Sequence, residues 1–299
     1  MKAILSLIGN PKDPPLLAEA TARARAARPE AGPLRVLAAG IAGELAVETG
    51  APAALADEIR TALGTLPVDV NVLPTEDRRK RLLIADMDST IITCECLDEI
   101  ADFAGLKGKV AAITERAMRG ELAFEPALRE RVALLAGMPA ATLQKVYDER
   151  VRLTPGARSL VQTMRAQGAH ALLVSGGFTF FTSRVAQAAG FESHRANVLN
   201  IAADKLDGTV AEPILGREAK LAALIESAAA HGLPLSAALA VGDGANDLAM
   251  IEAAQNAGGL GVAFHAKPLV AAAAKARINH GDLTALLYLQ GYDGTQFVS

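Results

Sequence analysis

The sequence predicts two domains: an α+β domain of ferredoxin-like order over residues 1–75, and a Rossmann-like α/β domain over residues 76–299. Three observations predict this fold class. The first 75 residues alternate strand-like and helix-like stretches in the order βαββαβ. From Leu82 onward, apolar strands alternate with helices, which is typical of a parallel sheet covered on both faces. Residues 91–150 show helical spacing alone, which predicts a small helical cap inserted after the first strand of that sheet.

The composition fits a globular protein of this size. Of 299 residues, 51% are hydrophobic and 21% charged, and the length favours two domains. The net charge of −3 and the 4% aromatic content give no basis for a nucleic-acid partner. The sequence contains no apolar run of about 18 residues and no signal-peptide pattern, so we expect no membrane partner and a cytoplasmic location. The two cysteines, Cys94 and Cys96, provide no disulfide framework and, without nearby histidines, no zinc site.

The elements of the first domain follow from its apolar periodicity. The pattern predicts helices over residues 15–27 and 51–64, and strands over residues 2–9, 33–40, 41–50 and 68–74. Pro74 and the charged run of residues 76–81 come next. Because acidic residues stand beside the basic ones and a strand follows at once, this run is interpreted as a solvated linker rather than a nucleic-acid patch.

The second domain begins with the apolar strand of residues 82–86 and the predicted cap. A strand over residues 169–177, a helix over 178–190 and a hairpin over 197–213 follow. The remaining elements alternate to the end of the chain: a helix over 216–232, a strand over 237–244, a helix over 245–255, a strand over 259–264, an alanine-rich helix, a strand over 276–280 and a last helix.

Polar side chains follow three of these apolar strands. They are Asp86 and Asp88, then Ser175, Gly176 and Gly177, and finally Asp243, Asn246 and Asp247. The carboxyl ends of neighbouring parallel strands meet at one edge of a sheet, where open α/β sheets bind ligands. Clustered carboxylates need a cation, and an all-oxygen site suits Mg²⁺.

The same strand ends predict phosphate chemistry. Ser175 is followed by two glycines that leave backbone N–H groups accessible before a helix, and Lys220 would add a positive charge. Asp86 is then expected to attack phosphorus and form an aspartyl-phosphate, while Asp88 transfers protons. The side chains of Asp86 and Asp243 and the backbone carbonyl of Asp88 would hold Mg²⁺. Each motif alone is also explained by turn or helix-cap chemistry, and Lys220 alone by a surface position.

Four segments, "DMDST", "SGG", Lys220 and "GDGANDLAM", resemble in this order the haloacid dehalogenase-like phosphatases. The resemblance spans roughly residues 81–289. It extends to the phosphoserine phosphatases of the SerB type through "DSTIITCECLDEIA" and the stretch from Arg116 to Leu135. It implies Mg²⁺-dependent hydrolysis of O-phosphoserine to serine and phosphate, the last step of serine biosynthesis, through an aspartyl-phosphate.

The resemblance also implies a role for each motif residue. Glu95 would bind the substrate ammonium and Arg131 its carboxylate, whereas spacing alone would equally allow Arg129. Met118 and Phe124 would form an apolar wall. The residues expected at the phosphate and the metal are Ser175, Gly176, Lys220 and Asn246, with Asp247 beside the direct metal ligands.

The first domain resembles the amino-acid-binding (ACT-type) domain of longer SerB proteins, which would allow a homodimer through residues 1–75. Two alternatives stay open at this point. The protein could act on another small phosphomonoester, or transfer the phosphoryl group to an alcohol. From a different class, it could be an amino-acid-sensing regulatory protein with vestigial catalytic motifs.

Overall fold

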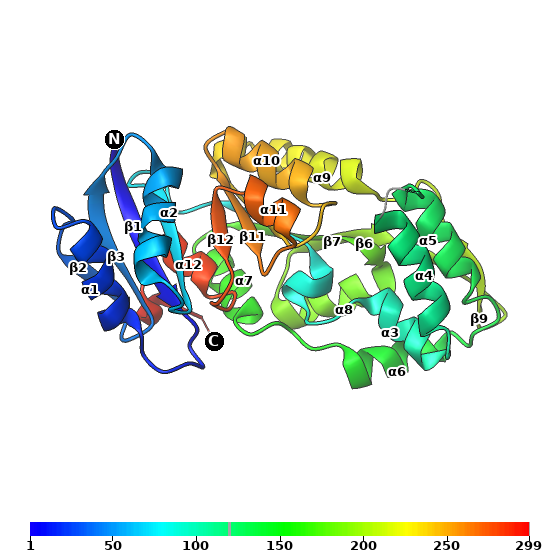
Figure 1. The fold of residues 1–299 in the computed structure, drawn as a ribbon. Coiled ribbons are helices and arrows are strands. Elements are labelled where there is room, and N and C mark those ends of the chain that lie inside the picture. The colour runs from blue at the N-terminus through cyan, green and yellow to red at the C-terminus, as the bar shows by residue number, and fades with distance from the viewer. Residues whose placement is uncertain (119–120, 299) are drawn as a thin grey trace.

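The computed structural model describes residues 1–118 and 121–298. Of Met118 it describes the backbone but not the side chain. Within this part the chain forms a four-stranded sheet, a six-stranded sheet and a two-stranded hairpin. The four-stranded sheet and its helices lie at one end of the molecule, and a group of short helices lies at the other, beyond the six-stranded sheet (Figure 1). None of the helices among these described residues is long and apolar enough to cross a bilayer.

The N-terminal sheet has the predicted ferredoxin-like order. It is antiparallel with strand order β2-β3-β1-β4, formed by β1 (Lys2–Gly9), β2 (Leu34–Ala38), β3 (Ala42–Glu48) and β4 (Val68–Pro74). Helices α1 (Leu17–Ala27) and α2 (Pro52–Leu63) pack on it. Leu5, Leu45 and Ile59 are fully buried between these layers, because alternate strand residues point to the helices.

The six-stranded sheet is parallel and has the order β12-β11-β10-β5-β6-β7. Its strands are β5 (Leu82–Ala85), β6 (His170–Phe178), β7 (Ser193–Asn197), β10 (Ala238–Gly242), β11 (Leu260–Phe264) and β12 (Ala276–Ile278). Leu82 and Ile84 pack on one face, whereas Leu83 and Ala85 pack on the other. The predicted parallel sheet with two covered faces is thereby confirmed.

Two groups of helices cover this sheet (Figure 1). On the face of Leu82 and Ile84 lie α9 (Arg217–Ala230), α10 (Leu248–Asn256) and α11 (Pro268–Ala273). On the face of Leu83 and Ala85 lie α7 (Ala157–Ala166), α8 (Thr179–Ala189) and α12 (Ala285–Leu289). The sequence did not predict β7 as a separate strand, because its residues, "SHRAN", contain no apolar run and form an edge strand.

The insertion between β5 and β6 is helical, as predicted. It contains α3 (Cys96–Phe103), α4 (Lys107–Met118), α5 (Phe124–Ala133) and α6 (Ala141–Arg150). The predicted hairpin, β8 (Leu199–Ala202) and β9 (Lys205–Val210), packs against it, and β9 runs beside α5 (Figure 1). The Gly137 N–H donates to the Leu206 carbonyl at 2.8 Å. The cap region therefore includes a hairpin from outside residues 91–150.

The charged run after β4 is not fully solvated, so that prediction was wrong for two of its residues. Lys80 is 7% exposed, and its Nζ donates to the carbonyls of Asp77, Ser236 and Gly258 at 2.7, 2.9 and 3.3 Å. The Arg78 guanidinium pairs with the buried Glu44 at 2.7 Å. Two of these three carbonyls come from distant segments, and a local charge pattern does not reveal them.

Two polar residues of β4 connect the two sheets. The Asn71 amide donates to the Arg277 carbonyl at 2.9 Å, and its Oδ1 accepts from the Arg277 N–H at 2.8 Å. The buried Asp69 carboxylate accepts from the N–H groups of Asn279, His280 and Gly281. These side chains of the edge strand β4 therefore provide hydrogen-bond partners for the backbone of the segment that begins at β12.

Candidate active site

The three polar strand ends predicted from the sequence lie side by side, because β5 lies between β10 and β6. A cavity of about 120 Å³ opens at this edge of the sheet and extends to the cap. Nine predicted residues line it: Asp86, Asp88, Glu95, Phe124, Arg131, Gly176, Gly177, Asp243 and Asn246. Residues far apart in the chain therefore form one polar pocket.

A tight turn after β5 brings both aspartates of the first motif to the cavity. The Asp86 N–H still donates to the Val241 carbonyl of β10 at 3.0 Å. The chain then turns over Met87–Ile91, where Asp88 leaves helical geometry and Ser89 adopts a φ of 55°. The Ser89 hydroxyl donates to Glu95 Oε1 at 2.6 Å. The turn is thus tied to the first residue of the cap that lines the pocket.

Lys220 lies in the first turn of α9 and is buried, at 2% exposure. Its Nζ donates to Asp86 Oδ1 at 2.5 Å and to Asp247 Oδ1 at 2.6 Å. Burial lowers the pKa of Lys220, but the attraction of Asp247 and Asp86 outweighs it and leaves the pKa raised. The side chain is therefore a permanent ammonium within the site.

Three carboxylates surround one point of the cavity floor. One oxygen from each of Asp86, Asp243 and Asp247 lies within 4.8 Å of the other two. Burial, followed by the charge of Asp247, raises the pKa of Asp243 to about 6 and raises that of Asp86 well above its usual range. Three carboxylates against one ammonium leave this buried set short of positive charge, so the cluster can hold a metal cation. The second oxygen of Asp247 accepts from the Gly244 N–H at 3.0 Å.

Asp88 is held by hydrogen bonds to both of its oxygens. Oδ1 accepts from the Cys96 N–H at 2.9 Å, and Oδ2 accepts from the Ser175 hydroxyl at 3.1 Å. Burial, followed by the charge of Glu95, raises the pKa of Asp88 to about 6. A carboxyl group with this pKa can both donate and accept a proton near neutral pH.

The cap contributes the far wall of the cavity. Phe124 lies against Gly176 so closely that a Cβ atom at Gly176 would be 3.0 Å from the ring Cζ. Arg131 donates from Nε to the Ala127 carbonyl at 3.1 Å and lines the cavity. Arg129, the alternative on spacing, is instead paired with Glu212 at 2.7 Å on the surface. The side chain of Met118 is outside the described residues, so its place in the wall stays a prediction.

Lys267 is a cavity residue that the sequence reasoning missed. Its Nζ lies 3.9 Å from Asp243 Oδ2, and its side chain is 59% exposed. It follows β11, the strand beside β10, so the end of a fourth adjacent strand was the available signal. Further lining residues without a predicted role are Leu97, Leu128, Phe178 and Gly244.

Comparison with known proteins identifies the family. The model of the haloacid dehalogenase-like hydrolases matches residues 83–252. The chain belongs to this family. The haloacid dehalogenase-like resemblance of the four sequence motifs is thereby confirmed, and the matched residues extend from β5 to α10.

Individual haloacid dehalogenase-like relatives match more of the chain. A phosphoserine phosphatase of Streptomyces coelicolor is 42% identical over 298 residues, which are 97% of this chain and 70% of that protein. The structure of a probable phosphoserine phosphatase from Vibrio cholerae has a TM-score of 0.79 at 32% identity, over 97% of this chain and 86% of that one. A phosphoserine phosphatase solved as a phospho-aspartyl intermediate analogue has a TM-score of 0.64 at 36% identity, over 70% and 98%.

Proposed function

We infer that this protein is a phosphoserine phosphatase, which hydrolyses O-phosphoserine to serine and phosphate. One observation carries the inference: a single cavity holds Asp86 and Asp88 on its floor, and Glu95 and Arg131 on its cap side. A carboxylate and a guanidinium together match the ammonium and carboxylate groups of an amino acid. The S. coelicolor relative of that name, which aligns with 97% of the chain, supports the same substrate.

We propose that the phosphate group binds at the end of β6. The Ser175 hydroxyl and the N–H of Gly176 would donate to phosphate oxygens. Asn246, which follows β10 on the other side of β5, would also bind the phosphate. The close approach of Phe124 to Gly176 supports this, because only glycine leaves the backbone of that residue accessible. Lys220 supplies the positive charge, and its buried pairing with Asp86 fixes the attacking carboxylate.

The proposed reaction has two steps that use the two first-motif aspartates. An oxygen of Asp86 forms a bond to phosphorus while the bond from phosphorus to the serine oxygen breaks, and Asp88 gives its proton to that oxygen. Asp88, now ionised, takes a proton from water, whose oxygen attacks phosphorus and releases Asp86 and phosphate. The pKa of about 6 at Asp88 supports both uses of this group.

Mg²⁺ is the cation that we propose for the carboxylate cluster. The side chains of Asp86 and Asp243 and the Asp88 carbonyl would hold it, with Asp247 beside them. The donors are all oxygen atoms, and hard oxygen donors suit Mg²⁺. When bound, the ion supplies positive charge that offsets the charge of the phosphate as Asp86 approaches it.

Phosphate release from a panel of small phosphomonoesters, with Mg²⁺ and with a chelator, tests the function. We expect O-phosphoserine to have the highest kcat/KM and the chelator to remove turnover. A higher kcat/KM for a phosphate without ammonium and carboxylate groups would refute the substrate. Amino-acid binding without phosphate release from any ester would instead support a regulatory protein.

We also propose the division of the chain into a domain of residues 1–75 and a phosphatase domain of residues 76–299, with a cap from about 91 to 150.

A homodimer through the first domain is proposed because the edge strand β2 leaves Val36 53% exposed. A cytoplasmic location is consistent with two free thiols, at Cys94 and Cys96. Light scattering of the full chain and of the Val36→Lys variant tests the dimer.

A further inference from the structure

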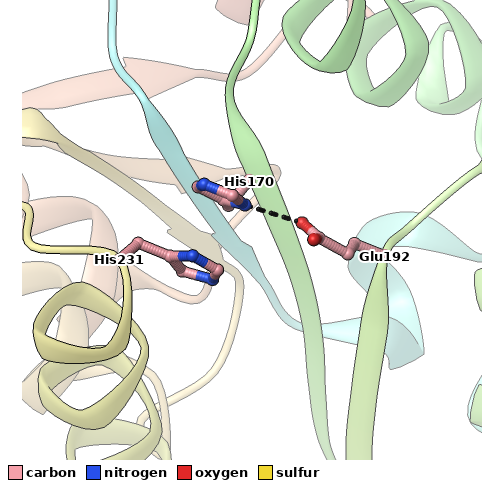
Figure 2. A group of neighbouring side chains, drawn as sticks. All are labelled: His170, Glu192 and His231. Carbon is pink, nitrogen blue, oxygen red and sulfur yellow. Dashed lines mark hydrogen bonds and ion pairs between the residues drawn. The ribbon is translucent and has the colours of Figure 1, made fainter.

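A second cluster of possible metal ligands lies outside the active site (Figure 2). His170 is the first residue of β6, Glu192 directly precedes β7, and His231 follows the last residue of α9. One ligand atom of each residue lies within 4.8 Å of the other two. Three separate elements therefore bring two imidazoles and one carboxylate to the same point.

This cluster is at the opposite end of the sheet from the catalytic residues. Along β6, His170 precedes Ser175 by five residues, which is about 16 Å of extended strand. Along α9, His231 follows Lys220 by eleven residues, which is also about 16 Å of helix. The cluster thus shares two elements with the active site but no residue.

We propose that His170, Glu192 and His231 form a binding site for a divalent transition metal ion of the Zn²⁺ type. Imidazole nitrogens with one carboxylate are the ligands of three-residue zinc sites, whereas Mg²⁺ selects oxygen ligands. All three side chains are at least partly exposed, so water can complete a fourth position. The donor set therefore selects a different metal from the carboxylate cluster of the active site.

The present contacts keep these side chains close to a binding arrangement. His170 Nδ1 lies 2.9 Å from Glu192 Oε2, and the rings of His170 and His231 stack at 3.3 Å with an interplanar angle of 12°. The hydrogen bond from His170 lowers the pKa of Glu192, so its carboxylate is ionised. Two nitrogen ligands of a tetrahedral zinc ion lie about 3.4 Å apart. Because the three ligand atoms already lie within 4.8 Å of one another, rotation of these side chains is the movement that we expect binding to need.

A neighbouring arginine acts on the carboxylate of this cluster. Arg165 is the cation whose charge reaches Glu192 in addition to the two histidines. Its Nη1 donates to the Gly190 carbonyl at 2.9 Å, which directs the guanidinium to the backbone. A bound ion would fasten the start of β6, the start of β7 and the end of α9 together. Because the unfolded chain lacks this arrangement, binding should stabilise the fold.

Zinc titration of the untagged full chain in excess Mg²⁺ tests this site. Zn²⁺ can also enter the carboxylate cluster, so the decisive quantity is the difference in bound equivalents between the wild type and His231→Ala. We expect the wild type to bind one more equivalent than His231→Ala, and a Zn²⁺-dependent rise in Tm that this variant lacks. Glu192→Gln keeps the side-chain shape but removes the charge. It should lower the affinity for this additional Zn²⁺ ion by about tenfold or more.

His280→Ala is the matched control, because His280 is an exposed histidine outside both possible metal groups. It should bind as many equivalents as the wild type. Circular dichroism and phosphate release, which we expect to be unchanged in His231→Ala, establish that this variant is folded. Equal equivalents and equal Zn²⁺-dependent Tm shifts in the wild type and His231→Ala would overturn the proposal, and so would an equal loss in His280→Ala.

Discussion

Replacement of Arg131 by alanine tests how the cavity selects its substrate. Its Nε is already engaged by the Ala127 carbonyl, so the two Nη groups are those expected to bind the substrate carboxylate. Two hydrogen bonds to a charged group contribute about 1.5 kcal/mol each at the lower end of their range. Because water can enter the enlarged cavity of the variant, we take this lower end. The loss is then about 3 kcal/mol, or roughly 150-fold in kcat/KM for O-phosphoserine.

The assay compares two substrates and two variants. An aryl phosphate has no carboxylate for Arg131, so its kcat/KM should change by less than about threefold in Arg131→Ala. Arg129→Ala removes the same type of side chain from the same helix, but this arginine pairs with Glu212 on the surface. The kcat/KM for both substrates should therefore stay unchanged in this variant. An equal loss on both substrates in Arg131→Ala, or a loss on O-phosphoserine in Arg129→Ala, would show that the cap does not recognise the amino acid in this way.

Three further predictions concern single aspartates. Asp86→Asn should lower phosphate release from every substrate by about 10³-fold or more while circular dichroism stays unchanged, and substantial release would exclude Asp86 as the nucleophile. Asp243→Asn, measured with a chelator, should raise the free energy of unfolding by up to about 3 kcal/mol above pH 6 but not at pH 4. The sign follows from the pKa of Asp243, which is raised from 3.8 to about 6: stability is present below pH 4 and is lost as the pH rises to 6. Asp69→Ala should cost about 3 kcal/mol in urea unfolding because it leaves the N–H groups after β12 without an acceptor, whereas the exposed Asp57→Ala should cost much less.

The two covered faces of the large sheet were predictable because they depend on short-range patterns, whereas the order of its strands was not predicted. A buried parallel strand must be apolar on both sides, and "LLIA" has side chains that reach two separate cores. The strand ends were predictable for a related reason: polar residues directly after such a strand mark the point where the sheet ends. The polar strand β7 was missed because it has neither signal.

The burial of lysines could not be read from the sequence in the same way. Lys220 is separated from Asp86 by 134 residues and from Asp247 by 27, so no local pattern contains its partners. A lysine on an amphipathic helix is ordinarily exposed, and only the order of motifs gave Lys220 a role. Lys80 had no such motif, and its interpretation as a solvated linker residue was wrong. Burial of a charge is set by partners that the fold supplies, and these become visible only in three dimensions.

The cost of ionising the buried carboxylates of the active site links catalysis to the stability of the fold. Asp86, Asp243 and Asp247 are each at most 7% exposed, and the buried Lys220 pairs with Asp86 and Asp247 while the exposed Lys267 lies 3.9 Å from Asp243. Without a cation, the raised pKa values of Asp86 and Asp243 mean that ionisation at neutral pH destabilises the folded chain. A bound divalent ion would reverse this effect, because it favours the ionised carboxylates that only the folded chain brings together. The same charge deficit that would bind the metal for reaction should therefore make Mg²⁺ raise Tm in the wild type, and raise it less in Asp243→Asn.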